Sequence, residues 1–185
     1  MSIGPEPDSR SLLQFFLMSG KLKAELRRGW VKKLGMDHPE SVADHSYRTA
    51  FMAMVISDIR GLDAEKAMRL ALLHDLPEAV VGDATPEERS GARKTAFETK
   101  AMDEILSDLP KDIRELYREV WDDFVEGESK ESRLVRQLDK VEMAMQAWEY
   151  ANESGNPSSA REFWDSAKAH VTDEALTELL AQVEP

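Results

Sequence analysis

Apolar residues recur every three or four positions along most of this 185-residue chain. Residues at this spacing share one face of an α-helix, whereas a half-buried strand needs strict alternation, and no alternating β-branched run is present. We therefore expect an all-α fold. After a disordered start through Asp8, the predicted helices cover residues 9–27, 41–60, 64–76, 92–108, 110–126, 130–153, 157–170 and 172–183.

The chain has no internal repeat and no low-complexity linker. Its length is that of one domain with a sizeable core. We expect a single domain over residues 1–185, with a core at about 9–153 and C-terminal helices at about 157–183. Residue preferences at helix starts predict side-chain caps at three positions, namely Asp63, Asn156 and Thr172. Pro110 and Pro157 suit first-turn positions.

Two predicted helices carry a histidine on their inward face. Ser41 and Asp44 form a capping-box pattern, after which one face holds Val42, His45, Thr49, Met52, Ile56 and Ile59. In the next helix one face holds Ala67, Leu70, Ala71 and His74. Either histidine alone also fits a hydrogen-bonded core residue. His38 and His170 lie in polar surroundings, so we expect both at the surface.

A carboxylate borders the apolar stripe of a later helix. The stripe consists of Leu134, Leu138, Val141, Met145 and Trp148, with Asp139 at its edge. Burying a carboxylate is costly unless positive charge meets it. Asp139, His45, His74 and the adjacent Asp75 together offer two imidazoles and two carboxylates. This mixed set suits a divalent ion such as Mn, Fe, Co, Ni, Zn or Mg, and fewer than six protein ligands leave room for water.

Pro77 interrupts the helix that carries the His-Asp pair. A proline removes a backbone donor and clashes with the preceding turn, so this helix should end or kink just past Asp75. The chain then leads into Glu78 and Asp83, which we expect beside the metal. Both are candidates for catalytic or ligand roles, although solvated acids are the usual alternative.

A second interruption of the helical pattern is the segment Arg27-Arg28-Gly29-Trp30, where the first predicted helix ends. A guanidinium group grips phosphate oxygens as a fork, and an indole offers a flat face to a base or sugar. The alternative is an ordinary helix end with Trp30 packed in the core. The sequence does not decide whether Arg27 or Arg28 faces the site.

The formal net charge of −12 argues against polyanionic binding partners. It repels nucleic acid and anionic lipid surfaces, while leaving room for a small anion beside local positive charge. Cysteine is absent, and the apolar run from Leu12 to Met18 is far shorter than a membrane span. We expect a cytoplasmic protein that binds neither nucleic acid nor membranes.

With these residues in place, the chain resembles the HD-domain metal-dependent phosphohydrolases, and within them the small 5′-deoxynucleotidase branch. The ordered pattern H…HD…D is specific to the superfamily. Two further segments are specific to the branch, Gly29-Trp30 and Pro39-Glu40-Ser41-Val42. The matching stretches span residues 27 to about 150, and the last thirty residues hold no matching motif.

The resemblance implies a role for each matched position. His45, His74, Asp75 and Asp139 match the metal ligands, and Glu78 matches the acid that assists the attacking water. Asp83 matches an acid near the substrate or a second ion. Arg27 and Trp30 match the phosphate and nucleoside contacts. The implied protein is an all-α HD-domain bundle, commonly a homodimer, that hydrolyses deoxyribonucleoside 5′-monophosphates.

One departure and three alternatives accompany this resemblance. Leu76-Pro77 replaces the small or polar residues frequent in relatives, which bears on substrate fit. Guanosine-tetraphosphate hydrolases place a Glu-Asp pair after the dyad, whereas here Ala79 follows Glu78. Cyclic dinucleotide phosphodiesterases of the HD kind carry a Gly-Tyr-Pro motif that is absent. A nucleotide sensor or helical interaction module with a structural metal is the third alternative.

Overall fold

The fold is that of a computed structural model, which describes residues 8–85, 88 and 91–185. These residues form helices and contain no strand, which confirms the all-α expectation. We expected a disordered start through Asp8, and residues 1–7 of that segment lie outside the described residues. Within the described part of the chain, no helix combines the length and the apolar character needed to cross a bilayer.

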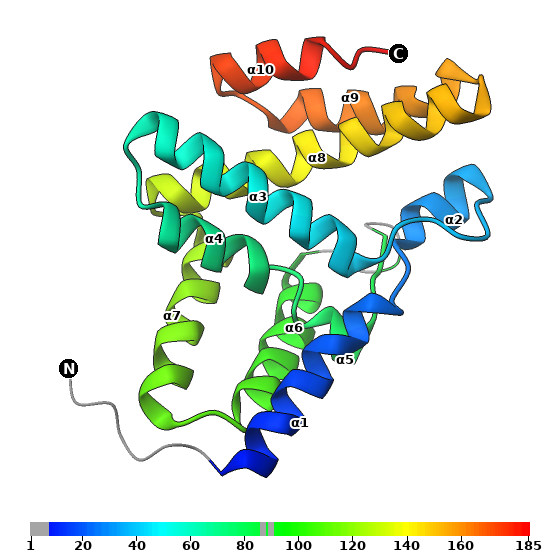
Figure 1. The fold of residues 1–185 in the computed structure, drawn as a ribbon. Coiled ribbons are helices and arrows are strands. Elements are labelled where there is room, and N and C mark those ends of the chain that lie inside the picture. Colours follow the sequence, from blue (N-terminus) through cyan, green and yellow to red (C-terminus); the bar gives the residue numbers. More distant parts are fainter. Residues whose placement is uncertain (1–7, 86–87, 89–90) are drawn as a thin grey trace. The chain divides into compact units, whose positions relative to one another are not determined.

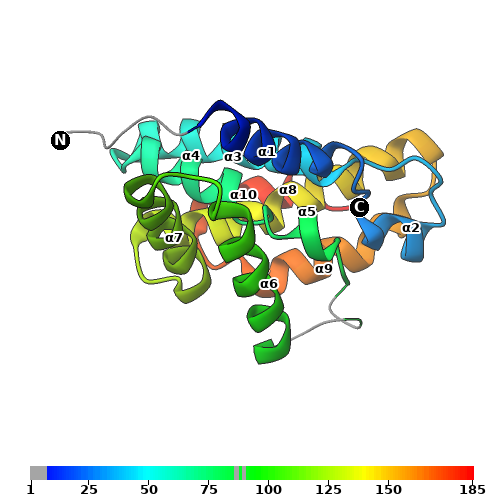
Figure 2. The same ribbon diagram turned by 90° about the horizontal axis from the view of Figure 1, so that it is seen from below.

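The chain forms two compact units, and their boundaries fall inside α3 (Val42–Arg60) and near the end of α4 (Ala64–Leu73). The first unit contains residues up to Tyr47 together with Leu72–Glu126. In it α1 packs against α5 and α6, and α6 packs against α7 (Figure 2). Its elements are α1 (Ser9–Gly20), η1 (Lys21–Lys23), α2 (Arg28–Leu34), α5 (Glu78–Val81), α6 (Gly91–Leu106) and α7 (Lys111–Glu126). The expectation of one domain stays a prediction.

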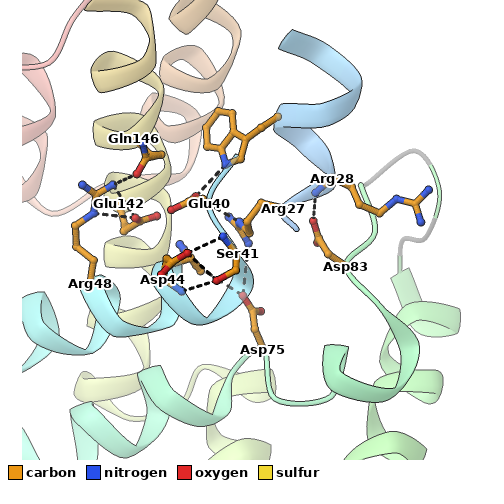
Figure 3. Close-up of polar contacts among 12 residues, drawn as sticks. Arg27, Arg28, Glu40, Ser41, Asp44, Arg48, Asp75, Asp83, Glu142 and Gln146 are labelled. Carbon is orange, nitrogen blue, oxygen red and sulfur yellow. Dashed lines mark hydrogen bonds and ion pairs between the residues drawn. The ribbon is translucent and has the colours of Figure 1, made fainter. Parts of the chain in front are cut away.

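The second unit contains Arg48–Ala71 and Gly127–Pro185. Its longest helix is α8 (Lys130–Ser154), against which the following elements pack in Figure 1. These are η2 (Pro157–Ala160), α9 (Arg161–His170) and α10 (Glu174–Ala181). Within this unit α3 and α8 are joined by Arg48, whose Nε donates to buried Glu142 at 2.9 Å (Figure 3). The Nη1 atom of Arg48 donates to Glu149 at 2.8 Å.

Two of the four predicted helix caps are present, and a third lies one residue away. The fourth residue, Asn156, stands at the N-cap of η2 but makes no side-chain cap hydrogen bond. The amide of Asp44 donates to Ser41 Oγ at 3.2 Å and the amide of Ser41 donates to Asp44 Oδ2 at 2.9 Å, which completes the capping box. Asp63 caps α4 by accepting from the Lys66 amide. The cap of α10 is Asp173 and not Thr172, because the carboxylate of Asp173 accepts the Leu176 amide at 3.1 Å.

The first predicted helix was too long. It ends at Gly20, and α2, which the sequence pattern did not predict, begins at Arg28. The reason is pairing with a distant segment: the Arg27 amide donates to the Glu40 carbonyl at 3.1 Å, and the Val42 amide donates to the Glu25 carbonyl at 2.8 Å. Backbone groups engaged in this way cannot continue a helix.

The predicted stripes of α3 and α8 are confirmed in their first halves and fail toward their C-terminal ends. The stripe residues that are buried as predicted are Val42, His45 and Thr49 on α3 and Leu134, Leu138 and Val141 on α8. The expected buried residues Ile59 and Trp148 are 75% and 39% exposed. Small residues lie inside instead, namely Ala53 and Ser57 on α3 and Ala144 and Ala147 on α8. Small side chains allow close packing, and hydrophobic spacing alone does not reveal that preference. The stripe of α4 is as predicted, with Ala67, Leu70 and Ala71 buried.

Replacing Arg48 should destabilise the second unit strongly. Glu142 is fully buried, and Arg48→Met would remove its charge-assisted hydrogen bonds while leaving the carboxylate inside. We expect the free energy of unfolding in urea to fall by about 3 kcal/mol. The control is Arg60→Met, which breaks a partly exposed pair with Asp173 and should cost at most about 1 kcal/mol. Equal losses in the two variants would contradict this account of Arg48.

Candidate functional site

The first unit brings His45, His74 and Asp75 together. The capping box starts α3 and directs His45 inward, while α4 ends at Leu73 and leaves the His-Asp pair in the turn before Pro77. His74 Nε2 lies 3.0 Å and His45 Nε2 lies 3.7 Å from Asp75 Oδ2, and the two ring centroids are 5.4 Å apart. Both histidines are buried. His38 and His170 are exposed, as predicted.

This donor set fits a divalent metal ion. Two imidazole nitrogens meet one carboxylate oxygen in a buried position, and such mixed N/O donors are those that first-row divalent ions prefer. The next acid along the chain, Glu78, has its Oε2 buried without a hydrogen-bond partner among the described residues. Asp139 belongs to α8 in the second unit, where Lys140 Nζ donates to its Oδ2 at 2.8 Å. Its part in the metal site stays a prediction.

Two neighbouring carboxyl groups have pKa values displaced in opposite directions. Burial opposes ionisation of Asp75, but the charge and hydrogen bond of His74, with the charges of His45 and Arg27, outweigh it and lower the pKa of Asp75. Burial raises the pKa of Glu78 well above its ordinary value, and the negative charges of Asp75 and Asp83 raise it further. Asp75 is therefore suited to remain an ionised ligand, and Glu78 is suited to hold a proton.

The two arginines have different surroundings. The Nη1 atom of Arg27 lies 3.5 Å from Asp75 Oδ2, and its Nε lies 3.8 Å from Glu40 Oε1 (Figure 3). The guanidinium group of Arg28 is half-exposed and lies 3.3 Å from Glu88. The structure therefore places Arg27, and not the side chain of Arg28, beside the candidate metal ligands.

Asp83 interacts with the polypeptide backbone. Its Oδ2 accepts the Arg28 amide at 2.5 Å (Figure 3). The amide of Asp83 itself donates to Glu25 Oε1 at 3.0 Å. Gly82 precedes it with φ of +72°, a conformation that residues with a side chain rarely adopt. A Cβ atom at Gly82 would also come within 3.3 Å of the Glu25 carboxylate. A role of Asp83 toward substrate or a second ion stays a prediction.

Trp30 is packed in the interior. It is 1% exposed, and its Nε1 donates to Glu40 Oε1 at 2.9 Å. Its indole therefore has no open face for a ligand in this conformation, which matches the core alternative for this residue. A nucleoside contact by Trp30 stays a prediction that requires this side chain to become accessible.

Sequence patterns assigned no role to three residues near this cluster. Glu40 contacts both Arg27 and Trp30, and Glu25 holds the Asp83 amide. Lys94 on α6 is mostly buried; burial lowers its pKa, but the charges of Glu98, Asp75 and Glu78 outweigh that effect and raise it. Glu40 stands in the branch-specific Pro-Glu-Ser-Val segment, which was a usable signal. Glu25 and Lys94 lie outside every motif, so only the folded chain reveals them.

Comparison with known proteins gives consistent matches over nearly the whole chain. The HD-domain family pattern matches residues 19–180. The 5′-deoxynucleotidase HDDC2 of Homo sapiens is 40% identical over 177 residues, which cover 95% of this chain and 86% of that protein. The protein of the same name in Dictyostelium discoideum is 34% identical and covers 93% of this chain and 96% of its own length.

Solved structures show the same similarity. A conserved hypothetical protein from Pyrococcus furiosus superposes with a TM-score of 0.75 at 33% identity, covering 92% of this chain and 98% of that one. The match therefore extends over both compact units and includes the segments that carry His45, His74, Asp75 and Asp139. Because the family pattern covers most of the sequence and full-length relatives exceed 30% identity, this chain belongs to the HD-domain family.

Proposed function

We propose that this protein hydrolyses deoxyribonucleoside 5′-monophosphates to deoxyribonucleosides and phosphate with the help of a divalent metal. The observation that carries the proposal is the meeting of His45 and His74 at the Asp75 carboxylate, with Arg27 beside it. Relatives from Homo sapiens to Schizosaccharomyces pombe that bear the name 5′-deoxynucleotidase support the same activity. The enzyme is thus a metal-dependent phosphohydrolase.

The proposed metal ligands are His45, His74, Asp75 and Asp139. The first three are supported by their geometry, whereas Asp139 is assigned from the order of the H…HD…D pattern. A bound divalent ion would polarise a phosphoryl oxygen and acidify a water molecule. The candidate ions remain Mn, Fe, Co, Ni, Zn and Mg, and the donor chemistry favours the transition metals.

Arg27 is the proposed phosphate contact. Its guanidinium group is mostly buried and already lies against a carboxylate oxygen of Asp75. A planar guanidinium group forms paired hydrogen bonds with phosphate oxygens as readily as with a carboxylate. Arg27 would therefore orient a 5′-phosphate beside the metal ligands. Its positive charge would attract the phosphate despite the negative net charge of the chain.

Glu78 is the proposed proton carrier. Its Oε2 atom is buried and accepts no hydrogen bond from the described residues, and burial raises its pKa well above the ordinary value, which favours the protonated carboxyl group. In this role Glu78 holds a proton at the carboxyl group and exchanges it with the attacking water or the leaving oxygen. Asp83 is proposed to lie near the sugar, and Trp30 near the base when accessible.

The proposed ligands predict a metal-binding defect that does not depend on activity. His74→Ala, Asp75→Ala and Asp139→Ala should each lose most of the bound metal, because removing one of few ligands weakens binding by about 10-fold to 100-fold or more. Elemental analysis of the purified variants measures this. His170→Ala, which changes an exposed histidine, should retain the wild-type metal content. If Asp139→Ala alone retained its full metal content, Asp139 would not be a ligand and the other three assignments would stand.

Glu78→Gln should separate chemistry from metal binding. The amide keeps the size of the side chain but carries no exchangeable carboxyl proton, so kcat should fall by about 10²-fold to 10⁴-fold. Metal content should remain at the wild-type level. Glu104→Gln changes an exposed carboxylate of α6 and serves as the control. Unchanged kcat in Glu78→Gln would show that another group carries the proton.

The substrate class is tested by steady-state kinetics on matched deoxy and ribo 5′-mono-, di- and triphosphates with several divalent ions. We expect turnover of monophosphates, with a higher kcat/KM for the deoxy member of each pair. Equal kcat/KM for both sugars would make the protein a broad nucleotidase. Absence of turnover with every monophosphate would contradict the proposed activity and favour a nucleotide sensor.

We also propose a cytoplasmic homodimer that contacts neither nucleic acid nor membranes. The net charge of −12 supports the exclusion of polyanionic partners, and the absence of cysteine is consistent with a reducing compartment. The dimer is supported only by resemblance to the family.

A further inference from the structure

The chain around Arg27 is held by hydrogen bonds on both sides. Before it, Glu25 Oε1 accepts the Asp83 amide at 3.0 Å. After it, the Arg28 amide donates to Asp83 Oδ2 at 2.5 Å. Asp83 therefore connects residues 25 and 28 across the single turn in which Arg27 lies.

A second set of bonds holds the same turn from another direction. The Arg27 amide donates to the Glu40 carbonyl at 3.1 Å, and the Val42 amide donates to the Glu25 carbonyl at 2.8 Å. Arg27 itself is the N-cap of α2 and has an extended backbone, with φ of −64° and ψ of 102°. Its side chain thus leaves the backbone at a point fixed against two other segments.

The approach of Glu25 to the 82–83 turn is close. A Cβ atom at Gly82 would lie 3.3 Å from Glu25 Oε1, tighter than ordinary van der Waals contact. Glycine at this position therefore permits both the positive φ and the bond from Glu25. Because an ionised acceptor makes a stronger hydrogen bond than a neutral one, the carboxylate of Glu25 holds this turn firmly.

We propose that Glu25 is a positioning residue for the phosphate contact. Through the Asp83 amide it fixes the 82–83 turn, the Asp83 carboxylate then fixes the start of α2, and Arg27 is directed at Asp75 and at a 5′-phosphate bound there. Glu25 acts through Arg27 and touches no substrate. This inference rests on the proposed function for its effect on substrate, but the backbone arrangement can be tested independently.

The backbone arrangement is tested by amide hydrogen exchange of the full chain. In Glu25→Ala the amides of Asp83 and Arg28 should exchange about 10-fold faster than in the wild type, because a local restraint has been removed. Glu25→Gln keeps a carbonyl acceptor and should restore most of the protection. Glu119→Ala removes one exposed carboxylate of α7 and should change neither amide. Equal exchange in Glu25→Ala and the wild type would overturn the proposal, whether or not the protein hydrolyses nucleotides.

The effect on substrate is tested with a deoxyribonucleoside 5′-monophosphate. Glu25→Ala should raise KM about 10-fold with kcat within about 2-fold of wild type and with full metal content, whereas Glu25→Gln should restore KM. In a protein that already carries Arg27→Ala, adding Glu25→Ala should raise KM no further. An equal rise in both backgrounds, or joint loss of metal and kcat, would overturn the positioning role. A wild type that turns over no monophosphate would instead refute the proposed function.

Discussion

The buried carboxylate of Asp75 requires positive or metal partners, and much of the first unit is arranged around that need. A carboxylate removed from water is costly unless ionised or donor groups surround it. His74, His45 and Arg27 supply such groups from three separate segments. Each segment must therefore be fixed precisely enough to bring one side chain to a single oxygen atom. The capping box fixes His45, the end of α4 fixes His74, and the 25–28 turn fixes Arg27.

The same cluster shifts the pKa values of two acids in opposite directions, although these acids stand only three residues apart in the sequence. Asp75 is surrounded by positive groups and stays ionised, whereas Glu78 is buried beside Asp75 and Asp83 and has its pKa raised. Environment, and not residue type, thus separates the two pKa values, and the proposed roles of metal ligand and proton carrier follow this separation. Pro77 lies between them and ends the α4 segment, so α5 presents Glu78 from a new direction.

Sequence alone predicted the parts of the site that depend on local rules. The all-α class, the Ser41-Asp44 box, the inward histidines and the break at Pro77 follow from spacing and from residue preferences at helix ends. It did not predict α2, and it left the position of Trp30 open between a nucleoside contact and the core. Both depend on the pairing of residues 25–27 with residues 40–42, a contact between segments that no local pattern encodes. The predicted stripes of α3 and α8 hold at their first residues and fail at Ile59 and Trp148, because small residues such as Ala147 take the buried positions there.

The choice between the two arginines shows how backbone pairing assigns a role that composition cannot. Both residues carry the same charge and stand next to each other, so the sequence does not settle which one faces the site, although the resemblance matches Arg27 to the phosphate contact. Arg27 lies outside α2 with an extended backbone, whereas Arg28 is its first residue and contributes its amide to Asp83. One residue of difference therefore directs the guanidinium group of Arg27 to Asp75 and the half-exposed guanidinium group of Arg28 to Glu88. The contact that sets this register is made by Glu25, whose carboxylate reaches Asp83 and not the substrate.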